Sequence, residues 1–315
     1  MAQFDFHTTS DEAAESLKEA ITGKTIIITG VSPNSLGADT ARALVAKGPA
    51  TLILASQTPN KLEEVISSLE IPHGTTVRSL VLDLASLDGV RRAAADVNSY
   101  VQAIDSIICT AGVMATPSYQ KSKDGFELQF AVNHLGHFLF VNLLMDKLLD
   151  RNATVVIYTS EAHTRAKLDF LDDPSYGAGR EYEKWSAYSN SKLCNVLFSA
   201  GLAQRFGKRN LRSFSVDPGI IVSTALTRDV PQEDFIALGW VDEDGKMNAA
   251  IKTKTGAQGS STGIIAAFDQ NLSNEKGYYL ADGAMTDHGL LPAASNLALA
   301  DKLWKLSEGF VKQSF

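Results

Sequence analysis

The chain has 315 residues, of which 44% are hydrophobic and 21% are charged, and its formal net charge is −7. This composition supplies a sizeable core and excludes wholesale disorder, while the acidic balance argues against nucleic acid as the main partner, because phosphate backbones require a basic face. The length fits one large α/β domain or two small ones.

The first 22 residues are predicted to form a helical extension. A capping box between Thr9 and Glu12 would begin an amphipathic helix over residues 9–21. Its apolar face would consist of Ala13, Leu17, Ala20 and Ile21. The segment is acidic and mixed, without the basic and apolar regions of a signal peptide.

Seven short runs rich in β-branched residues follow, and helical patterns alternate with them. Most runs are apolar throughout, which suits strands that are buried on both faces. The runs cover residues 25–29, 50–55, 76–84, 105–112, 153–160, 211–219 and 277–282. The helical patterns cover residues 38–48, 60–70, 87–101, 132–149, 187–207 and 260–272. This alternation predicts an α/β fold with a doubly wound, seven-stranded parallel sheet.

Two irregular segments interrupt the alternation, near residues 161–187 and 220–258. Long irregular segments in a compact domain are usually functional lids or disordered loops. We therefore expect residues 23–315 to form a single domain, in which these two insertions cover the carboxyl ends of the strands.

A membrane span is not expected. Residues 138–149 form the richest apolar run, but Asn142, Asp146 and Lys147 interrupt it well below the length of a bilayer span. We therefore expect a cytoplasmic protein.

The sequence also predicts no metal site. Cys109 and Cys194 lie in apolar stretches without the spacing of metal ligands, which is typical of reduced core residues. His134 and His137 stand three apart on a predicted helix, where packed or hydrogen-bonded histidines are commoner than metal ligands.

The segment "TGVSPNSLG", residues 29–37, joins the first strand to a helix. Backbone N–H groups at a helix N-terminus make a ready anion site. The dinucleotide fingerprint G-x-G-x-x-G is incomplete, however, because Gly30 and Gly37 stand seven apart with Ser32 and Ser35 between them. The loop is either a phosphate-binding turn, in which the serine hydroxyls bond the phosphate, or a plain turn between a strand and a helix.

The end of the second strand bears on the choice of nucleotide. NAD-binding proteins usually place Asp or Glu there, to bond the 2′-hydroxyl of the ribose. This chain has Ser56 and Gln57 instead, and Lys61 is the nearest cation. Because no carboxylate would repel a 2′-phosphate, the segment favours NADP(H) over NAD(H).

Tyr188 and Lys192 stand four apart on a predicted helix, so they share one face. An ammonium group beside a phenol favours the phenolate and lowers the pKa of the tyrosine, which could then exchange a proton near neutral pH. The pattern YxxxK alone is also typical of an ordinary surface pair on an amphipathic helix.

Further motifs end the other strands, where open α/β sheets bind ligands. In chain order they are "LDL" with Asp83, "TAG" at 110–112, "VNHLGHF" with Asn133, "YTSEAH" with Ser160 and "DPG" at 217–219. Together with "TGVSPNSLG" and "YSNSK", they make the chain resemble the short-chain dehydrogenase/reductase superfamily, and most of all its retinol-dehydrogenase-like branch. The resemblance extends through "GAQGSSTGIIAAF" and "GYYLAD" to about residue 282.

The resemblance implies a Rossmann-type sheet and a catalytic tetrad. Tyr188 would be the general acid/base, and Lys192 would lower its pKa and bond the nicotinamide ribose. Ser160 would hydrogen-bond the substrate oxygen. Asn133 would support a proton relay through an irregularity in its helix.

The resemblance also implies contacts with the cofactor, which Tyr188 and Lys192 would share. The remaining residues would be Gly30, Ser32, Ser35, Leu36 and Gly37 at the pyrophosphate, Ser56, Gln57 and Lys61 near the 2′-position, Asp83 and Leu84 at the adenine, Ala111 and Gly112 at the ribose, and Pro218 and Gly219 at the nicotinamide.

The chain departs from the family pattern in three places. The glycine loop has one extra residue, and Ser35 stands where the middle glycine usually is. Gln57 occupies a position at which many relatives have arginine. The N-terminal anchor of membrane-bound retinol dehydrogenases is not expected here.

We therefore expect an NADP(H)-dependent oxidoreductase that interconverts a ketone or aldehyde with an alcohol, on a fairly large hydrophobic small molecule. The family often assembles through helices beside the Tyr-Lys helix, so a homodimer or homotetramer is expected. Two alternatives are a non-redox cyclase or isomerase on the same fold and a binding protein that senses nucleotides, since a fold does not determine a function.

Overall fold

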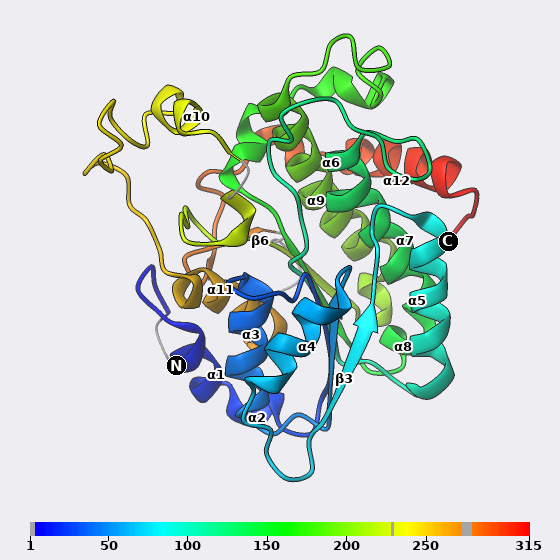
Figure 1. The fold of residues 1–315 in the computed structure, drawn as a ribbon. Helices are drawn as coiled ribbons and strands as arrows, with labels where there is room; N and C mark the ends of the chain where they lie inside the picture. The colour runs from blue at the N-terminus through cyan, green and yellow to red at the C-terminus, as the bar shows by residue number, and fades with distance from the viewer. Residues whose placement is uncertain (1–3, 228–229, 273–278) are drawn as a thin grey trace.

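The protein is built around one twisted sheet with helices on both faces (Figure 1). The computed structural model describes residues 4–227, 230–272 and 279–315. Within them an eight-stranded sheet has the order β3-β2-β1-β4-β5-β6-β7-β8. The strands are β1 Thr25–Thr29, β2 Thr51–Ser56, β3 Thr76–Val81, β4 Ser106–Cys109, β5 Thr154–Tyr158, β6 Arg212–Asp217, β7 Tyr279–Ala281 and β8 Ala284–Met285.

The strand pairing confirms the predicted parallel sheet. Strands β1 to β7 pair in parallel with their neighbours, and the two-residue strand β8, which was not predicted, pairs antiparallel with β7. The chain order reverses at β1, which lies between β2 and β4. Open α/β sheets bind their ligands at such a switch point, beyond the carboxyl ends of the strands.

The strand residues are apolar because helices cover both faces of the sheet. Ile26 and Ile28 of β1 belong to one hydrophobic cluster, and Ile27 between them belongs to the other. Side chains of a strand alternate between its two faces, so a strand between two helical layers needs apolar residues at every position. By contrast β3, at the sheet edge, is mostly exposed and has fewer apolar residues.

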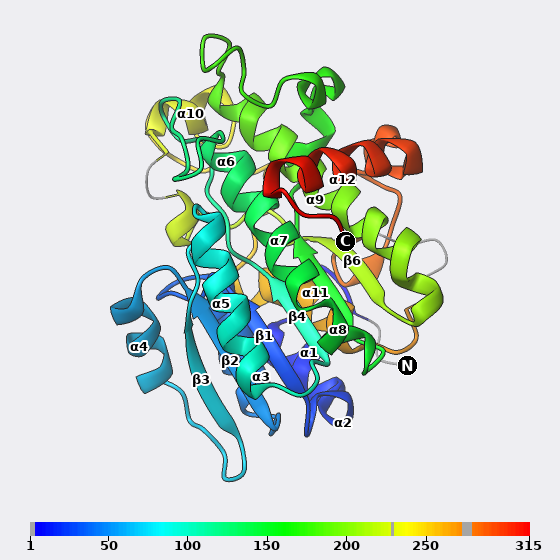
Figure 2. The same ribbon diagram turned by 90° about the vertical axis from the view of Figure 1, so that its right-hand side faces the viewer.

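Helices α1, α3, α4 and α11 cover one face, and α5, α7, α9 and α12 cover the other (Figure 2). The helices are α1 Ser10–Ser16, α2 Lys18–Ile21, α3 Leu36–Val45, α4 Pro59–Ser67, α5 Leu87–Tyr100, α6 Leu128–Phe130, α7 Gly136–Leu143, α8 Met145–Leu149, α9 Lys184–Phe206, α10 Gln232–Ala237, α11 Gly256–Phe268 and α12 Leu297–Val311. A π-helical turn, Ala131–Leu135, joins α6 to α7.

The N-terminal segment begins with the predicted capping box. The Thr9 hydroxyl accepts from the backbone N–H of Glu12, and the Glu12 carboxylate accepts from the backbone N–H of Thr9. The predicted single helix is divided into α1 and α2 at Leu17. Its expected apolar face is confirmed, because Ala13 and Ile21 are buried in the cluster that α3 and α11 share.

Helix α12 was not predicted, and it packs on α9. Its Trp304 ring lies 5.0 Å from Phe138 of α7 and 5.9 Å from Phe198 of α9, between ring centroids. A Cβ on Gly201 would lie 3.1 Å from the same indole, so the glycine permits this close approach. The pattern Ala300, Leu303, Trp304, Ser307 and Val311 has helical spacing and could have indicated the helix.

The two irregular segments contain short helical elements in their described residues. Residues 161–187 form the 3₁₀ turns Glu161–Arg165 and Leu168–Asp172 before α9 begins. Residues 220–258 contain the turn Ala225–Thr227, α10 and the first residues of α11. Across the described ranges, no helix has the length and apolarity needed to cross a membrane.

Candidate active site

The turn between β1 and α3 depends on two glycines. Gly30 has φ +72°, and a Cβ there would lie 2.6 Å from the Cα of Ala111. A Cβ on Gly37 would lie 2.8 Å from the carbonyl oxygen of Gly30 and 2.9 Å from the Thr110 hydroxyl. Both positions therefore exclude any larger side chain, which leaves the backbone open to a close-lying ligand at the N-terminus of α3.

Ser35 stabilises this turn through hydrogen bonds. Its hydroxyl oxygen accepts from the backbone N–H groups of Ser32 and Ala38, each at 3.1 Å, and it caps α3. Both bonds use lone pairs of the oxygen, so the Ser35 O–H can still donate to a phosphate as expected. The first N–H groups of α3, at Leu36 and Gly37, have no partner within the helix, so they can face an anion.

The ends of β2 and β3 bring Gln57 and Asp83 together. The Gln57 amide donates to Oδ1 of Asp83 at 3.2 Å, and Lys123 pairs with Oδ2 at 2.7 Å. Lys123 was not predicted, because it comes from the loop after β4. Lys61 is exposed on α4, Ser56 ends β2, and Leu84 is buried against Gly136.

Asn133 lies in the π-helical turn, so the predicted helix irregularity is present. Its side chain is fully buried. The amide oxygen accepts from the Val113 N–H at 2.8 Å, and the amide nitrogen donates to the Val113 carbonyl and the Ser191 hydroxyl, each at 2.9 Å. Asn133 therefore fastens the chain just after Ala111 and Gly112 to the helix that carries Tyr188.

A buried histidine extends this network to β1. His137 Nε2 lies 2.9 Å from the Thr29 hydroxyl, which also accepts from the Ala111 N–H at 3.2 Å. Its Nδ1 lies 3.2 Å from the Asn133 carbonyl. Since that carbonyl can only accept, Nδ1 carries the proton and Nε2 accepts from Thr29. Burial lowers the pKa of His137 to about 4, so the ring is neutral at pH 7.

Ser160 and Tyr188 meet at the end of β5. The Ser160 side chain hydrogen-bonds the Tyr188 hydroxyl, and Tyr188 is only 5% exposed. Ser160 also caps the 3₁₀ turn that follows it. The Trp185 ring stands edge-on to Tyr188, 6.3 Å away. The predicted pair of serine and tyrosine is thus assembled from segments 28 residues apart.

Lys192 lies beside Tyr188 as its helical spacing predicts. Its ammonium nitrogen is 5.6 Å from the centre of the Tyr188 ring, and it donates to the Tyr158 carbonyl at 3.2 Å. Burial lowers the pKa of Lys192 to about 8, and the nearby Asp217 carboxylate opposes this shift.

The expected lowering of the Tyr188 pKa is wrong. Burial raises the pKa of the Tyr188 hydroxyl well above its usual value, although the Ser160 hydrogen bond and Arg165 act in the opposite direction. Burial disfavours the phenolate more than these neighbours favour it.

The segment after β6 closes the site. Gly219 has φ +76°, and a Cβ there would lie 3.1 Å from the Lys254 side chain. Pro218 is half-buried beside it. His163 supports the same region, since its Nδ1 donates to the Ser160 carbonyl at 2.7 Å and its Nε2 accepts from the Leu291 N–H at 3.2 Å. His163 therefore holds these loops together.

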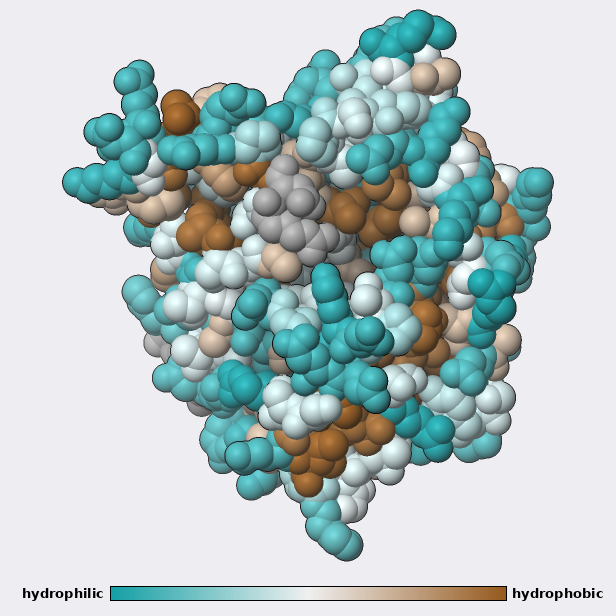
Figure 3. Space-filling model, in the orientation of Figure 1, coloured by the Kyte–Doolittle hydropathy of each residue, from teal (hydrophilic) through white to brown (hydrophobic). Residues whose placement is uncertain are grey.

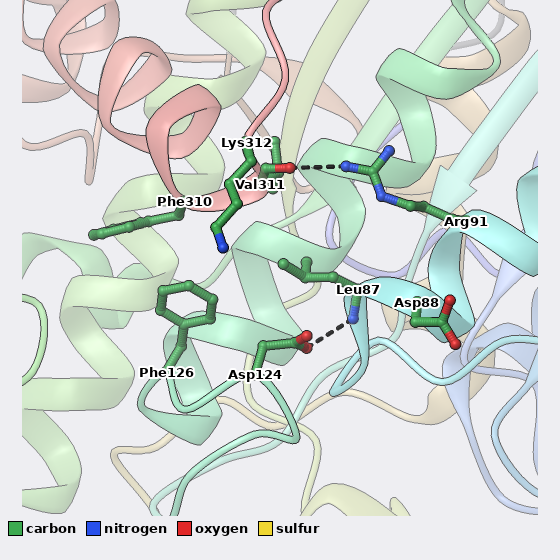
Figure 4. Close-up of a pocket in the computed structure, with 8 residues that line it drawn as sticks. All are labelled: Leu87, Asp88, Arg91, Asp124, Phe126, Phe310, Val311 and Lys312. Carbon is green, nitrogen blue, oxygen red and sulfur yellow. Dashed lines mark hydrogen bonds between the residues drawn. The ribbon is translucent and has the colours of Figure 1, made fainter.

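A hollow of about 390 Å³ lies apart from these residues, between α5 and the end of α12 (Figure 4). The Leu87 N–H donates to Asp124 at 2.8 Å, and Arg91 donates to the Val311 carbonyl at 2.7 Å. None of the predicted site residues lines this hollow. Its contacts fasten α12 to α5.

A smaller hollow of about 110 Å³ lies in the second irregular segment. It is lined by Val222, Thr227, Phe235, Trp240, Val241 and Met247. The Phe235 and Trp240 rings stack 5.7 Å apart. Hydrophobic residues reach the surface around α10 (Figure 3), where Ile236 is 37% exposed. The described part of this segment thus exposes apolar side chains around a small hollow.

Comparison with known proteins identifies the class. The family model for short chain dehydrogenases matches residues 24–234. Mouse retinol dehydrogenase 14 is 33% identical over 306 residues, covering 92% of this chain and 86% of its own. Human retinol dehydrogenase 12 is 32% identical over 287 residues, covering 90% and 85%. A crystal structure of an uncharacterised protein from Mycobacterium paratuberculosis is 30% identical, with a TM-score of 0.70 over 94% of this chain and 96% of its own.

The chain therefore belongs to the short chain dehydrogenase family. The resemblance to its retinol-dehydrogenase-like branch is confirmed, and so is the oxidoreductase class that acts on alcohols or carbonyl compounds with a nicotinamide cofactor. The crowded glycines at Gly30 and Gly37, with the α3 N-terminus at the switch point of the sheet, fit such a dinucleotide.

Proposed function

We propose that the protein is an NADP(H)-dependent oxidoreductase that interconverts a ketone or aldehyde with an alcohol on a fairly large hydrophobic molecule. One observation carries the proposal, which is the arrangement of Ser160 with the buried Tyr188 and Lys192 at the end of β5. A phenol that is hydrogen-bonded to a serine and flanked by an ammonium group is equipped to exchange a proton with a substrate oxygen.

Each residue of the site has its own role in the proposed reaction. When bound, the nicotinamide cofactor supplies or accepts the hydride. In reduction, Tyr188 donates its proton to the carbonyl oxygen, and the Ser160 hydroxyl bonds the same oxygen while negative charge develops on it. Lys192 holds a positive charge beside the phenol. Asn133 and its bonds to Val113 and Ser191 hold the helix and the β4 loop at a constant spacing.

With NADPH as the cofactor, we expect reduction to be the working direction. A phenol whose pKa lies above its usual value keeps its proton at neutral pH, and reduction needs that proton. Oxidation of an alcohol requires the phenolate, so it should increase as the pH rises.

Preference for NADP(H) rests on the end of β2. Ser56 and Gln57 present no carboxylate there, and Lys123 offsets the charge of the neighbouring Asp83. A 2′-phosphate would therefore meet less repulsion than beside an aspartate at position 57. Lys61 on α4 provides a second cation for the same phosphate.

The substrate class rests on the second irregular segment. Val222, Leu226 and Ile236 are exposed there, at 43%, 37% and 37%, and the Phe235–Trp240 pair lies among them. Apolar surface of this kind suits a ligand with a hydrophobic body.

The test is a Tyr188→Phe variant assayed with NADPH and a panel of aromatic and long-chain aldehydes. Removing the proton donor should reduce kcat by roughly 10²–10⁴-fold, while NADPH binding, followed by nicotinamide fluorescence, stays within about threefold of the wild type. Full turnover by Tyr188→Phe would contradict the proposal. Binding of NADPH by the wild type without reduction of any carbonyl compound would favour a nucleotide-sensing protein.

A further inference from the structure

Asp217 is a buried carboxylate at the edge of the candidate site. It ends β6 and is 8% exposed. Its Oδ1 accepts from the Gly219 N–H at 2.9 Å, and its Oδ2 accepts from the Tyr279 hydroxyl at 3.1 Å. Tyr279 begins β7, the next strand of the sheet. The carboxylate is thus held by two strands and by the turn that contains Pro218 and Gly219.

The position of Asp217 brings it close to Lys192. The Lys192 ammonium donates to the carbonyl of Tyr158, which pairs in register with Val216, the residue before Asp217. The Asp217 charge acts on Lys192, Tyr188, His163 and Tyr279. The other titratable groups that face these residues are His137 on α7, Glu161 and Arg165 on the turn after Ser160, and Asp282 after β7.

Among these described groups Glu161 and Arg165 are exposed, whereas Lys192 and Asp217 are buried and opposite in charge. His137 and His163 are kept neutral, because burial lowers the pKa of both rings. Asp282 already pairs with Lys254 at 2.6 Å. An ammonium group that is removed from water requires a nearby negative charge to remain protonated.

We propose that Asp217 is a positioning residue of this enzyme, whose carboxylate, oriented by Tyr279 and the Gly219 N–H, is the counter-charge that holds Lys192 as an ammonium ion beside Tyr188. The role in the reaction rests on the proposed function. The charge relation between Asp217 and Lys192 does not depend on it.

Removal of the Asp217 charge should change the pKa values of both Lys192 and Tyr188. Asp217 raises the pKa of Lys192 and also raises the pKa of Tyr188. A neutral residue at position 217 would therefore let both pKa values fall. Carbonyl reduction needs both groups protonated, so its alkaline limb should move to lower pH.

The alternative is that Asp217 only stabilises the turn through its hydrogen bonds. Two variants distinguish this role from an effect of its charge on Lys192. Asp217→Asn removes the charge and keeps an acceptor for the Gly219 N–H, while Tyr279 can accept from the new amide. Tyr279→Phe removes the hydrogen bond and keeps the charge. Asp217→Ser is a second neutral variant in case the asparagine fails to fold, which circular dichroism would detect.

The first measurement follows the Lys192 ammonium directly in protein without cofactor. Lysine labelled with ¹³C at Cε is titrated by NMR, and Lys192→Met assigns the resonance. We expect Asp217→Asn to lower the titration midpoint by about one pH unit, a roughly tenfold change in the proton dissociation constant, and Tyr279→Phe not to lower it. An unchanged midpoint in both neutral variants would overturn the inference.

The second measurement is the pH profile of aldehyde reduction with NADPH. The alkaline limb should move by a similar amount in Asp217→Asn and should not move to lower pH in Tyr279→Phe. If the NMR midpoint moves while the kinetic limb does not, the role of Asp217 in the reaction is refuted. If the midpoint moves and the wild type reduces no aldehyde, the charge relation holds and the proposed function fails.

Discussion

Gly30 and Ala111, at the ends of the adjacent strands β1 and β4, approach so closely that a Cβ on Gly30 would lie 2.6 Å from the Cα of Ala111. Two motifs that are 81 residues apart in the chain thereby share one wall of the proposed nucleotide site. Neither side of this contact can move without disturbing a strand of the sheet.

Gly30→Ala should therefore destabilise the protein and weaken NADPH binding more than tenfold. The variant combines a clash against backbone with a positive φ that costs about 1–2 kcal/mol on its own. Gly48→Ala is the matched control, because Gly48 has φ +69° and nothing within 4 Å of its Cβ position. Urea unfolding and nicotinamide fluorescence would measure both effects, and equal losses in the two variants would contradict the role of the contact.

The choice of nucleotide is tested at Gln57, which now donates to Asp83. Gln57→Asp should weaken NADPH binding by about tenfold or more, on the order of 1.4 kcal/mol, and should change NADH binding little, because the new charge would repel a 2′-phosphate. Separate fluorescence titrations with NADPH and NADH provide the comparison. Equal weakening of both nucleotides would indicate that residue 57 lies away from the 2′-position.

Lys184 and Asp234 form an ion pair between the start of α9 and α10, at 2.5 Å, with side-chain exposures of 23% and 13%. Lys184→Asp should loosen the second irregular segment and raise KM for a hydrophobic aldehyde by about fivefold, roughly 1 kcal/mol. Nucleotide binding should be unaffected. The reversed pair, Lys184→Asp with Asp234→Lys, should restore KM, and failure of this rescue would exclude the ion pair as the cause.

Trp304 is the main anchor of α12 on α9. Trp304→Ala should lower the free energy of unfolding by about 3–5 kcal/mol, because it empties a fully buried site. Leu297→Ala, on the same helix but 41% exposed, should change it by less than about 0.5 kcal/mol. Thermal unfolding of the two variants would give the comparison, and similar losses would show that the indole is not the anchor.

Helix α12 also bears on assembly, since it covers part of α9. The homodimer or homotetramer that the family resemblance implies stays a prediction. A subunit contact through the covered face of α9 would require α12 to move, so gel filtration of Trp304→Ala beside the wild type would detect any contact that this helix prevents.

The sheet could be predicted because its signal is local. Every position of β1 is apolar or threonine, and this pattern required two covered faces. Spacing on one helix likewise placed Lys192 beside Tyr188. The two-residue strand β8 carries too short a pattern to detect, whereas the sequence around Trp304 has the spacing of a buried helix face.

The electrostatics of the site could not be predicted in the same way. The Tyr188 pKa depends on how completely the fold removes the phenol from water, and no motif records that quantity. The bond between Asp217 and Tyr279 joins residues 62 apart. Lys123 and His137 contact partners, Asp83 and Thr29, that are 40 and 108 residues away in the chain.

The packing of α12 on α9 has a consequence for folding during synthesis of the protein. The ribosome completes α9 at Phe206 and begins α12 at Leu297, about ninety residues later. At synthesis rates of roughly 5–20 residues per second, the aromatic side of α9 waits on the order of 5–20 s for its cover. During that interval α9, which bears Tyr188 and Lys192, exposes hydrophobic side chains on the nascent chain. We therefore expect chaperones to bind there.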